Sequence, residues 1–520
     1  MKVEMKLIGF DDFRLELYHI WKLFDEEADL RYETTSDADM RMTIELTEDD
    51  SREVNVRAVL ERLNSLSPDD GPVSAWTRTE RRPMRYAEGE PRRRELKRAV
   101  GAATLHVLQE ATGIAQPWGV LTGVRPTKLM HRLLMRHSRE ESVRLLKEEY
   151  LLADEKARLL ADIAERQRKV IPDLFHLDRE VSIYVGIPFC PTKCAYCTFP
   201  AYDIRDSRGS VDGFLAGLHE EIRATGDWLK RAGLGITTIY WGGGTPTSLT
   251  AEQMDGLFAA MRESFPAMKR LRELTVEAGR PDTITPEKIE VMKKWNVDRI
   301  CVNPQSFTQR TLDLIGRHHT VEETVETFRM ARKMGMGNIN MDLIIGLPNE
   351  GPDEFRHTLN ELAKLMPESV TVHTLSFKRA SRMTQNRDRY EVAGRDEIAA
   401  MMDMATRFVA EHGYVPYYLY RQKNMLGNLE NVGYALEGRE CLYNIVMMED
   451  CQTIIALGCG AVSKVLFPKE ADVDGGESQK IERFPNPKEP SVYNRSYRDY
   501  IEKKLRLLDE AYLGGTVVNR

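Results

Sequence analysis

Between residues 181 and 376, short β-rich runs alternate with amphipathic stretches, and this alternation limits the possible folds more than any other feature of the chain. The strand candidates are Ser182–Phe189, Thr237–Trp241, Glu273–Ala278, Arg299–Asn303, Asn338–Ile345 and Val370–Ser376. The helix candidates between them are Val211–Lys230, Ala251–Glu263, Pro286–Trp295, Val321–Met334 and Asp353–Leu365. Repeated βα units favour a parallel sheet, so six of them predict a partial (β/α)6 barrel with its site in the loops that follow the strands.

The sequence on either side of this alternation has a different character. Met1–Phe10 and Met40–Thr47 alternate like strands, whereas the chain from Arg92 to Lys169 is mostly of helical period. We therefore predict an α/β protein with three regions: an N-terminal α+β module at 1–175, the partial barrel at 176–412 and a mixed C-terminal region that covers the substrate at 413–520. Within the last region, Asp472–Lys480 is expected to be a loop.

Composition and charge narrow the classes of function. The chain has 42% hydrophobic and 30% charged residues, which is typical of a soluble enzyme. Its 74 Lys and Arg against 81 Asp and Glu give a net charge of −7, which argues against nucleic acid as a partner. No run approaches the ~18 apolar residues of a membrane span, and charges interrupt the first twenty residues where a signal peptide would be apolar. We expect a cytoplasmic protein.

Three of the seven cysteines, Cys190, Cys194 and Cys197, fall within eight residues. A sparse and odd number of cysteines argues against a disulfide scaffold. Zinc usually requires a second Cys or His pair at short spacing, and none follows nearby. A [4Fe–4S] cube normally binds four thiolates, so three leave one iron open to a small molecule. We favour such a cluster, with a redox pair or half of a zinc site as alternatives.

Other residues of chemical interest are weaker signals. Asp342 is a lone acid inside an apolar strand and is costly there unless it is paired. The glycines of Trp241–Thr247 would let the backbone approach a charged ligand closely. His318 and His319 do not share a helix face, so we favour a structural role, or one at the cofactor's edge, over metal binding. Cys301 is expected to be buried and inert.

Around the three cysteines the chain resembles the radical S-adenosylmethionine (SAM) superfamily. More narrowly, it resembles the oxygen-independent coproporphyrinogen III oxidase family. Within that family it is most similar to the HemZ-type branch, the coproporphyrinogen dehydrogenases with a long N-terminal extension. The supporting segments are Gly123–His131, Phe189–Tyr202, Glu277–Thr283, Val302–Phe307, Val372–Ser381 and Tyr418–Asn424.

The resemblance implies a set of cofactor positions. Cys190, Cys194 and Cys197 would bind the cluster, the open iron would bind SAM, and the chain would hold one or two molecules of SAM in all. Glu277 matches a glutamate that binds the SAM ammonium, and Asp342 matches an acid that binds its ribose. The full set implied for SAM is Tyr184, Tyr196, Gly242, Gly243, Gly244, Thr245, Glu277, Gln305, Arg317, Asp342, Ser376 and Val462.

The resemblance also implies a reaction, the oxidative decarboxylation of coproporphyrinogen III to protoporphyrinogen IX in haem biosynthesis, with a tetrapyrrole substrate, an electron donor and an electron acceptor. Phe199 stands where proven oxidases have a further cysteine, and the haem-chaperone branch shares this departure. One alternative is therefore a haem-binding chaperone without oxidase activity. A radical SAM tetrapyrrole methyltransferase and a zinc-binding interaction protein are further alternatives.

A porphyrinogen carries several propionates and needs cationic donors around an aromatic cavity. Residues of these types follow the last predicted strand of the barrel. They are Lys378, Arg379, Arg421 and Lys423, with Tyr417, Tyr418 and Tyr420. The competing interpretation is that these residues are surface charges and core aromatics.

Overall fold

The computed structural model describes residues 1–33, 37–48, 53–63, 72–83, 92–123, 125–205, 210–266, 268–378, 381–422, 425–471 and 477–514. The chain forms two compact units, the first built from Met1–Asp162 and the second from Ile163–Glu470 and Glu477–Arg520. Neither contains, among its described residues, a helix of the length and apolar character that a bilayer crossing requires.

The first unit is a five-stranded sheet with helices, as the strand-like and helical segments predict. Its strand order is β2-β1-β3-β4-β5; β1 pairs in parallel with β2 and β3, and the remaining pairs are antiparallel. Alternate residues of β3 and β4 are buried in a core that they share with α2. The elements are β1 (Lys2–Ile8), α1 (Arg14–Trp21), β2 (Asp29–Arg31), β3 (Met40–Glu48), β4 (Glu53–Arg62), β5 (Ser74–Pro83), α2 (Arg92–Thr112), α3 (Thr127–Leu134), α4 (Arg139–Tyr150) and the start of α5 (Asp154–Val170).

The second unit is built on an eleven-stranded sheet in the order β14-β15-β13-β12-β11-β10-β9-β6-β16-β17-β18. The seven neighbouring strands β13, β12, β11, β10, β9, β6 and β16 are parallel to one another. All of these except β16 are the predicted strands of the partial barrel. The six are β6 (Glu180–Ile187), β9 (Gly235–Gly243), β10 (Glu273–Val276), β11 (Arg299–Cys301), β12 (Ile339–Ile345) and β13 (Ser369–Thr374). The predicted α/β class and barrel are therefore confirmed.

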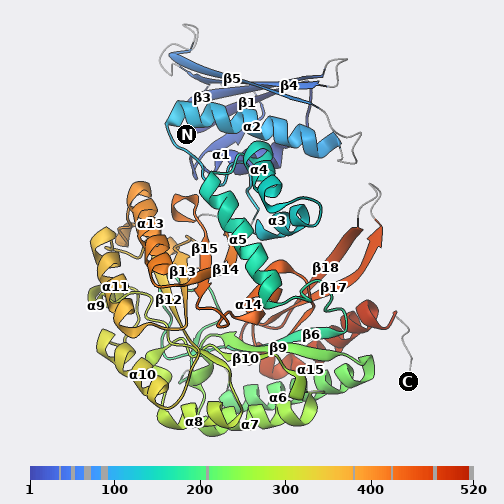
Figure 1. The fold of residues 1–520 in the computed structure, drawn as a ribbon, viewed down its shortest axis with the longest axis vertical. Helices are drawn as coiled ribbons and strands as arrows, with labels where there is room; N and C mark the ends of the chain where they lie inside the picture. Colours follow the sequence, from blue (N-terminus) through green and yellow to red (C-terminus); the bar gives the residue numbers. More distant parts are fainter. Residues whose placement is uncertain are drawn as a thin grey trace. The chain divides into compact units, whose positions relative to one another are not determined.

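The helices that follow these strands lie along the outer side of the curved sheet (Figure 1). They are α6 (Val211–Ala232), α7 (Ala251–Ser264), α8 (Pro286–Lys294), α9 (Gln309–Leu314), α10 (Val321–Lys333), α11 (Pro352–Leu365) and α13 (Arg395–Glu411). The short α12 (Arg382–Gln385) lies elsewhere, where the Met383 amide donates to the Ala195 carbonyl at 3.0 Å. Local signals set where they begin. Thr250 and Thr320 form capping boxes at α7 and α10, and Thr285 caps α8 ahead of a proline in its first turn.

The residues after α13 extend both edges of the sheet. The antiparallel strands β14 (Val415–Tyr420) and β15 (Asn431–Ala435) lie beside β13, while β16 (Ile454–Gly458) adds in parallel to β6. The remaining elements are α14 (Leu442–Glu449), β17 (Val462–Ala471), β18 (Glu477–Pro485) and α15 (Pro490–Tyr512). The predicted loop at Asp472–Lys480 is wrong for Glu477–Lys480, which form the start of β18. Strand pairing at this edge of the sheet overrides the local turn signals. Residues 472–476 lie outside the described residues.

Candidate functional site

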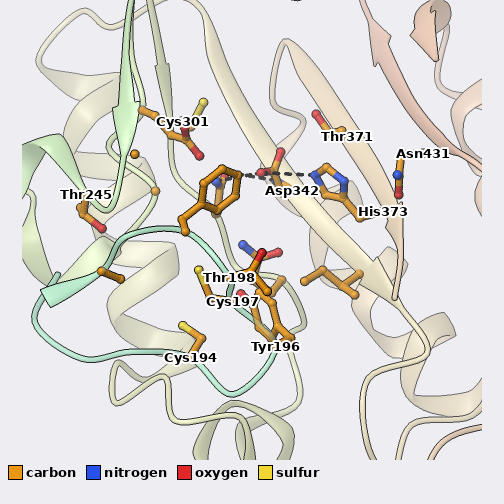
Figure 2. A pocket seen from close by; sticks show the side chains of 18 of the residues that line it. Cys194, Tyr196, Cys197, Thr198, Thr245, Cys301, Asp342, Thr371, His373 and Asn431 are labelled. Carbon is orange, nitrogen blue, oxygen red and sulfur yellow. Dashed lines mark hydrogen bonds and ion pairs between the residues drawn. The ribbon is translucent and has the colours of Figure 1, made fainter. Parts of the chain in front are cut away.

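A cavity of about 370 Å³ lies at the carboxyl ends of the central parallel strands of the second unit. Most of the residues predicted to hold a cluster or a cofactor line it: Cys190, Cys194, Tyr196, Cys197, Gly243, Gly244, Thr245, Glu277, Gln305, Arg317, Asp342 and Ser376. Figure 2 shows Cys194, Tyr196 and Cys197 on a loop at one side of the cavity, with Asp342 and His373 on strands across from them. The structure thus brings distant parts of the sequence to one place.

The cysteine loop begins at the end of β6. Cys190 ends the short strand β7 (Phe189–Cys190), which pairs with β8 (Tyr202–Asp203) and closes the base of the loop. At the far end, the Ala195 amide donates to the Ile315 carbonyl at 2.9 Å. The loop is therefore held at its base by the β7–β8 pair and at its tip by the bond to Ile315.

The three thiols are buried or half-buried and unpaired with one another. Cys190 Sγ lies 3.3 Å from Thr245 Oγ1, and a guanidinium nitrogen of Arg280 lies 3.9 Å from Cys194 Sγ. Burial raises the pKa of Cys190 to about 12 and also raises the pKa of Cys197. Binding to iron would replace these thiol protons.

All three thiols line the same cavity, as the ligands of one cluster must. Among the described residues, no three His, Cys, Asp or Glu side chains converge closely enough to hold one metal ion. In a [4Fe–4S] cube each cysteine binds a different iron, so its ligands stand apart around the cluster. The residues present therefore fit a cluster with three protein ligands.

The glycine-rich loop after β9 packs directly on the cysteine loop. A Cβ on Gly244 would lie 2.5 Å from the Phe189 carbonyl oxygen, and one on Gly243 would lie 2.8 Å from that of Ile187. Gly243 also has φ +104°, which disfavours a side chain. The glycines thus allow the two loops to touch, and they bring Thr245 to Cys190.

Glu277 follows β10 and lines the cavity, and no cation among the described residues forms an ion pair with it. The Tyr240 hydroxyl donates to its Oε2 at 3.2 Å. Burial, together with the nearby Asp342 carboxylate, raises the pKa of Glu277 to about 7. A cationic ligand beside this carboxyl group would offset both effects, so the site fits an ammonium.

Asp342, the lone acid of its strand, is paired. Its two oxygens accept from the amides of Asn303 at 2.9 Å and Asn340 at 2.7 Å, and His373 Nε2 lies 3.6 Å away. Burial acts to raise the pKa of Asp342, but His373 and the hydrogen bonds from Asn340 and Thr371 outweigh it, and the pKa falls below its ordinary value. The carboxylate is therefore held ionised and in a fixed orientation, facing Tyr196 across the cavity (Figure 2).

Two further cavity residues carry buried polar atoms that have no hydrogen-bond partner in the described part of the chain. Gln305 has φ +67°, and its Oε1 makes no hydrogen bond. Arg317 donates from Nη2 to the carbonyls of Gly279 and Asn303, each at 2.7 Å, while its Nε has no partner. A strained backbone and unsatisfied buried polar groups are typical of a ligand site.

Three of the predicted cofactor residues do not line the cavity. Tyr184 stacks with Tyr240 and Tyr443, with ring centroids 6.2 Å apart in each case. Gly242 lies beneath that stack, since its Cβ would come within 3.0 Å of the Tyr184 hydroxyl. Val462 is 43% exposed at the start of β17. Their roles stay predictions.

The residues predicted to bind substrate divide in the same way. Lys378, Tyr418 and Tyr420 line the cavity. Arg421 is buried and donates to Asn428 Oδ1 at 2.5 Å, and Tyr417 is a core residue. Arg379 and Lys423 lie outside the described residues.

Sequence reasoning missed Arg280, Asn303 and His373. Arg280 is only 3% exposed, and it forms a two-pronged ion pair with Asp282 while it faces Cys194. The Arg-Pro-Asp segment directly after the β10 strand end was a usable signal, because charged residues rarely enter a core unpaired. Asn303 and His373 gave no such signal; only strand pairing places them beside Asp342.

Comparison with known proteins gives consistent matches. The family model described as the radical SAM superfamily matches residues 184–362. The chain is 51% identical over 519 residues to the oxygen-independent coproporphyrinogen-III oxidase-like protein HemZ of Bacillus subtilis (strain 168), which covers 98% of this chain and 99% of that protein. It is 30% identical over 282 residues to the heme chaperone HemW of the same strain, covering 54% of this chain and 70% of HemW. Among solved structures, coproporphyrinogen III oxidase HemN from Escherichia coli matches with a TM-score of 0.49 and 22% identity, covering 65% of this chain and 72% of that one.

Proposed function

This chain belongs to the radical SAM family of the oxygen-independent coproporphyrinogen-III oxidase-like protein HemZ, and from that premise we propose that it decarboxylates a porphyrinogen oxidatively without oxygen. The observation that carries the proposal is the convergence of three thiols, the Glu277 carboxyl group and the fixed Asp342 carboxylate on one cavity. When bound, a [4Fe–4S] cluster and SAM together supply a 5′-deoxyadenosyl radical that can remove a hydrogen atom.

The residues of the chain would then bind, orient and shield the reactants. Cys190, Cys194 and Cys197 would bind three irons. Glu277 would accept from the SAM ammonium, and Asp342 would accept from ribose hydroxyls. Holding the reacting carbon against the substrate hydrogen is the main contribution that such a site can make to the rate.

For the substrate we propose coproporphyrinogen III, converted to protoporphyrinogen IX. Each of two propionates would lose one hydrogen atom, one CO2 and one electron to become a vinyl group, and an external acceptor would take that electron. Lys378 lines the cavity and would pair with a substrate carboxylate, and Tyr418 and Tyr420 would supply an aromatic wall. Through β14 and β15, the region after residue 412 would complete the substrate side of the site.

Anaerobic product analysis tests this proposal. The reconstituted protein is incubated with reductant, SAM and coproporphyrinogen III, and the tetrapyrroles are separated by chromatography. We expect the wild type to form protoporphyrinogen and 5′-deoxyadenosine. The Lys378→Ala variant should bind the substrate poorly and form neither product. Methylated tetrapyrrole would instead indicate a methyltransferase, and 5′-deoxyadenosine without a changed tetrapyrrole would refute the substrate.

A haem chaperone is the second candidate, supported by the 30% identity to HemW and by Phe199. Phe199 is 58% exposed at the mouth of the cavity and offers an apolar contact to a flat macrocycle. Stoichiometric haem binding by the full chain, without any decarboxylated product in the same preparation, would favour this function over the oxidase.

A further inference from the structure

The floor of the cavity holds a buried arginine. Arg299 is the first residue of β11, lines the cavity and is only 1% exposed. Its Nη2 donates to Ser369 Oγ at 3.1 Å, and its Nη1 lies 3.6 Å from Cys301 Sγ. Its Nε is buried and makes no hydrogen bond within the described part of the chain. We call Arg299, Cys301, Asn340 and Ser369 the floor site.

The charge of Arg299 is not balanced by an ion pair. A guanidinium stays charged in a protein, and burial removes its hydration. No Asp or Glu among the described residues forms an ion pair with Arg299, whose hydrogen-bond partners are a hydroxyl and a thiol. Glu273, on the neighbouring β10, instead accepts from the amides of Leu442 and Tyr443 at 2.8 and 3.1 Å. A buried cation of this kind points to an anionic ligand, because charges rarely enter a protein interior unpaired.

The side chains around Arg299 are polar and fixed. The interior of a (β/α) barrel is usually filled by branched aliphatic residues. Here Asn340 Oδ1 accepts from the hydroxyls of Ser369 at 3.0 Å and Thr371 at 3.2 Å. Because the same Ser369 hydroxyl accepts from Arg299, this network holds the guanidinium in place while its Nε–H is left for a ligand.

The floor site lies deeper in the barrel than the carboxylate expected to bind the ribose of SAM. By strand pairing, Cys301 is level with Asn340, one inward position before Asp342. Figure 2 shows Cys301 across the cavity from the cysteine loop. A ligand on Arg299 would therefore approach SAM from the side away from the cluster, where a substrate can enter without displacing it.

We propose that the floor site binds a carboxylate of the substrate, that of the propionate to be decarboxylated. The inference rests on the proposed function and adds a substrate contact to it. The carboxylate would accept from Nε and from a terminal nitrogen of Arg299, the two-pronged geometry that a guanidinium favours. In a propionate, the carbon attached to the ring is two bonds from the carboxyl carbon, so anchoring the carboxylate also restricts where the hydrogen on that carbon can lie. Binding makes and breaks no covalent bond.

A small acid tests the floor site without any tetrapyrrole, through the Tm of the anaerobically reconstituted full chain. Sodium propionate should raise the Tm of the wild type above its value in sodium chloride of equal concentration. Arg299→Met should abolish this difference, and Arg299→Lys, which keeps the charge, should retain part of it. Without propionate, Arg299→Met should be no less stable than the wild type, because it removes an unpaired buried charge.

The matched control is Lys464→Met, which removes a buried cation that has a carboxylate partner, Asp450 at 2.7 Å, outside the cavity lining. This variant should have a lower Tm than the wild type and the same response to propionate. An equal propionate response in the wild type and Arg299→Met would overturn the floor site. A ligand-free Tm that falls as far in Arg299→Met as in Lys464→Met would make Arg299 a structural residue and would also overturn it.

Anaerobic binding of coproporphyrinogen III and of SAM then distinguishes the possible sources of the carboxylate. We expect Arg299→Met to weaken porphyrinogen binding at least tenfold and to leave SAM affinity within threefold of the wild type at pH 8.5. A tenfold loss of SAM affinity would assign the carboxylate to SAM, and unchanged porphyrinogen binding would exclude a substrate contact; either overturns the inference. If the wild type binds no porphyrinogen but propionate still distinguishes it from Arg299→Met, the proposed substrate is refuted and the carboxylate site is supported.

Discussion

Single residues at this site are held in states that cost stability and serve a ligand. Glu277 is the clearest case, because its carboxyl group is buried beside Asp342 and, among the described residues, has a tyrosine rather than a cation as its partner. Its pKa is raised from the ordinary 4.5 to about 7. Between these pH values the unfolded chain releases the proton and the folded protein keeps it, so the free energy of unfolding falls as pH rises to about 7.

Glu277→Gln should therefore have opposite effects on stability and on binding. Without ligand, we expect the variant to have a higher Tm than the wild type at pH 8, with the difference shrinking towards pH 5. SAM affinity should be at least tenfold weaker in the variant at pH 8. The SAM affinity of the wild type should weaken as pH falls through about 7. If the SAM affinity of the variant changes with pH by the same amount, the effect belongs to another group. Calorimetry and equilibrium binding measure these quantities.

Cys194→Ala should abolish reconstitution of an oxygen-sensitive iron–sulfur chromophore, because two thiolates cannot hold the cube. Cys451→Ala is the matched control, since that thiol lies outside the cavity lining and contacts the Val446 carbonyl. Iron and sulfide analysis with electron paramagnetic resonance reports the result. Zinc in place of iron in anaerobic wild-type protein would contradict the assignment.

At the scale of elements, a buried ion pair joins α6 to α15. Glu221 accepts from Tyr493, from Asn486 and from the Gly458 amide, and it pairs with the fully buried Lys504. Burial acts to raise the pKa of Glu221, but Lys504 and these donors outweigh it and lower that pKa. This network fixes α15 beside α6 and the end of β16.

Lys504→Ala should lower the free energy of unfolding by about 3–5 kcal/mol, because it leaves a buried carboxylate unpaired. Arg498→Ala is the control: Arg498 pairs at 3.0 Å with Glu220 on the same two helices, but in solvent. We expect the control to leave stability unchanged within error. Chemical denaturation compares them, and equal effects would contradict a special role for the buried pair.

At the scale of the whole molecule, the sheet of the second unit is assembled from discontinuous parts of the chain. The six barrel strands come from residues 180–374, but later residues supply neighbours to β13 on one edge and to β6 on the other. They also bring Tyr418, Tyr420 and Asn431 to the cavity. The barrel is therefore completed only when the residues after 412 are in place.

A chain that ends at His412 should not form a stable barrel. Both sheet edges would be exposed, which favours aggregation, and part of the cavity wall would be missing. Size-exclusion chromatography should show aggregated material, and SAM binding should be lost. A monodisperse truncated protein with wild-type SAM affinity would show that the edge strands are dispensable.

The sequence alone determined the six βα units, the cysteine loop and the strand-end positions of Glu277 and Gln305, because these follow from local periodicity, spacing and turn chemistry. Only the tertiary structure decided which distant groups meet: Asn303 and His373 beside Asp342, Arg280 beside Cys194, and β16 beside β6. The physical reason is that strand order and burial depend on packing between segments far apart in the chain, which no local pattern encodes.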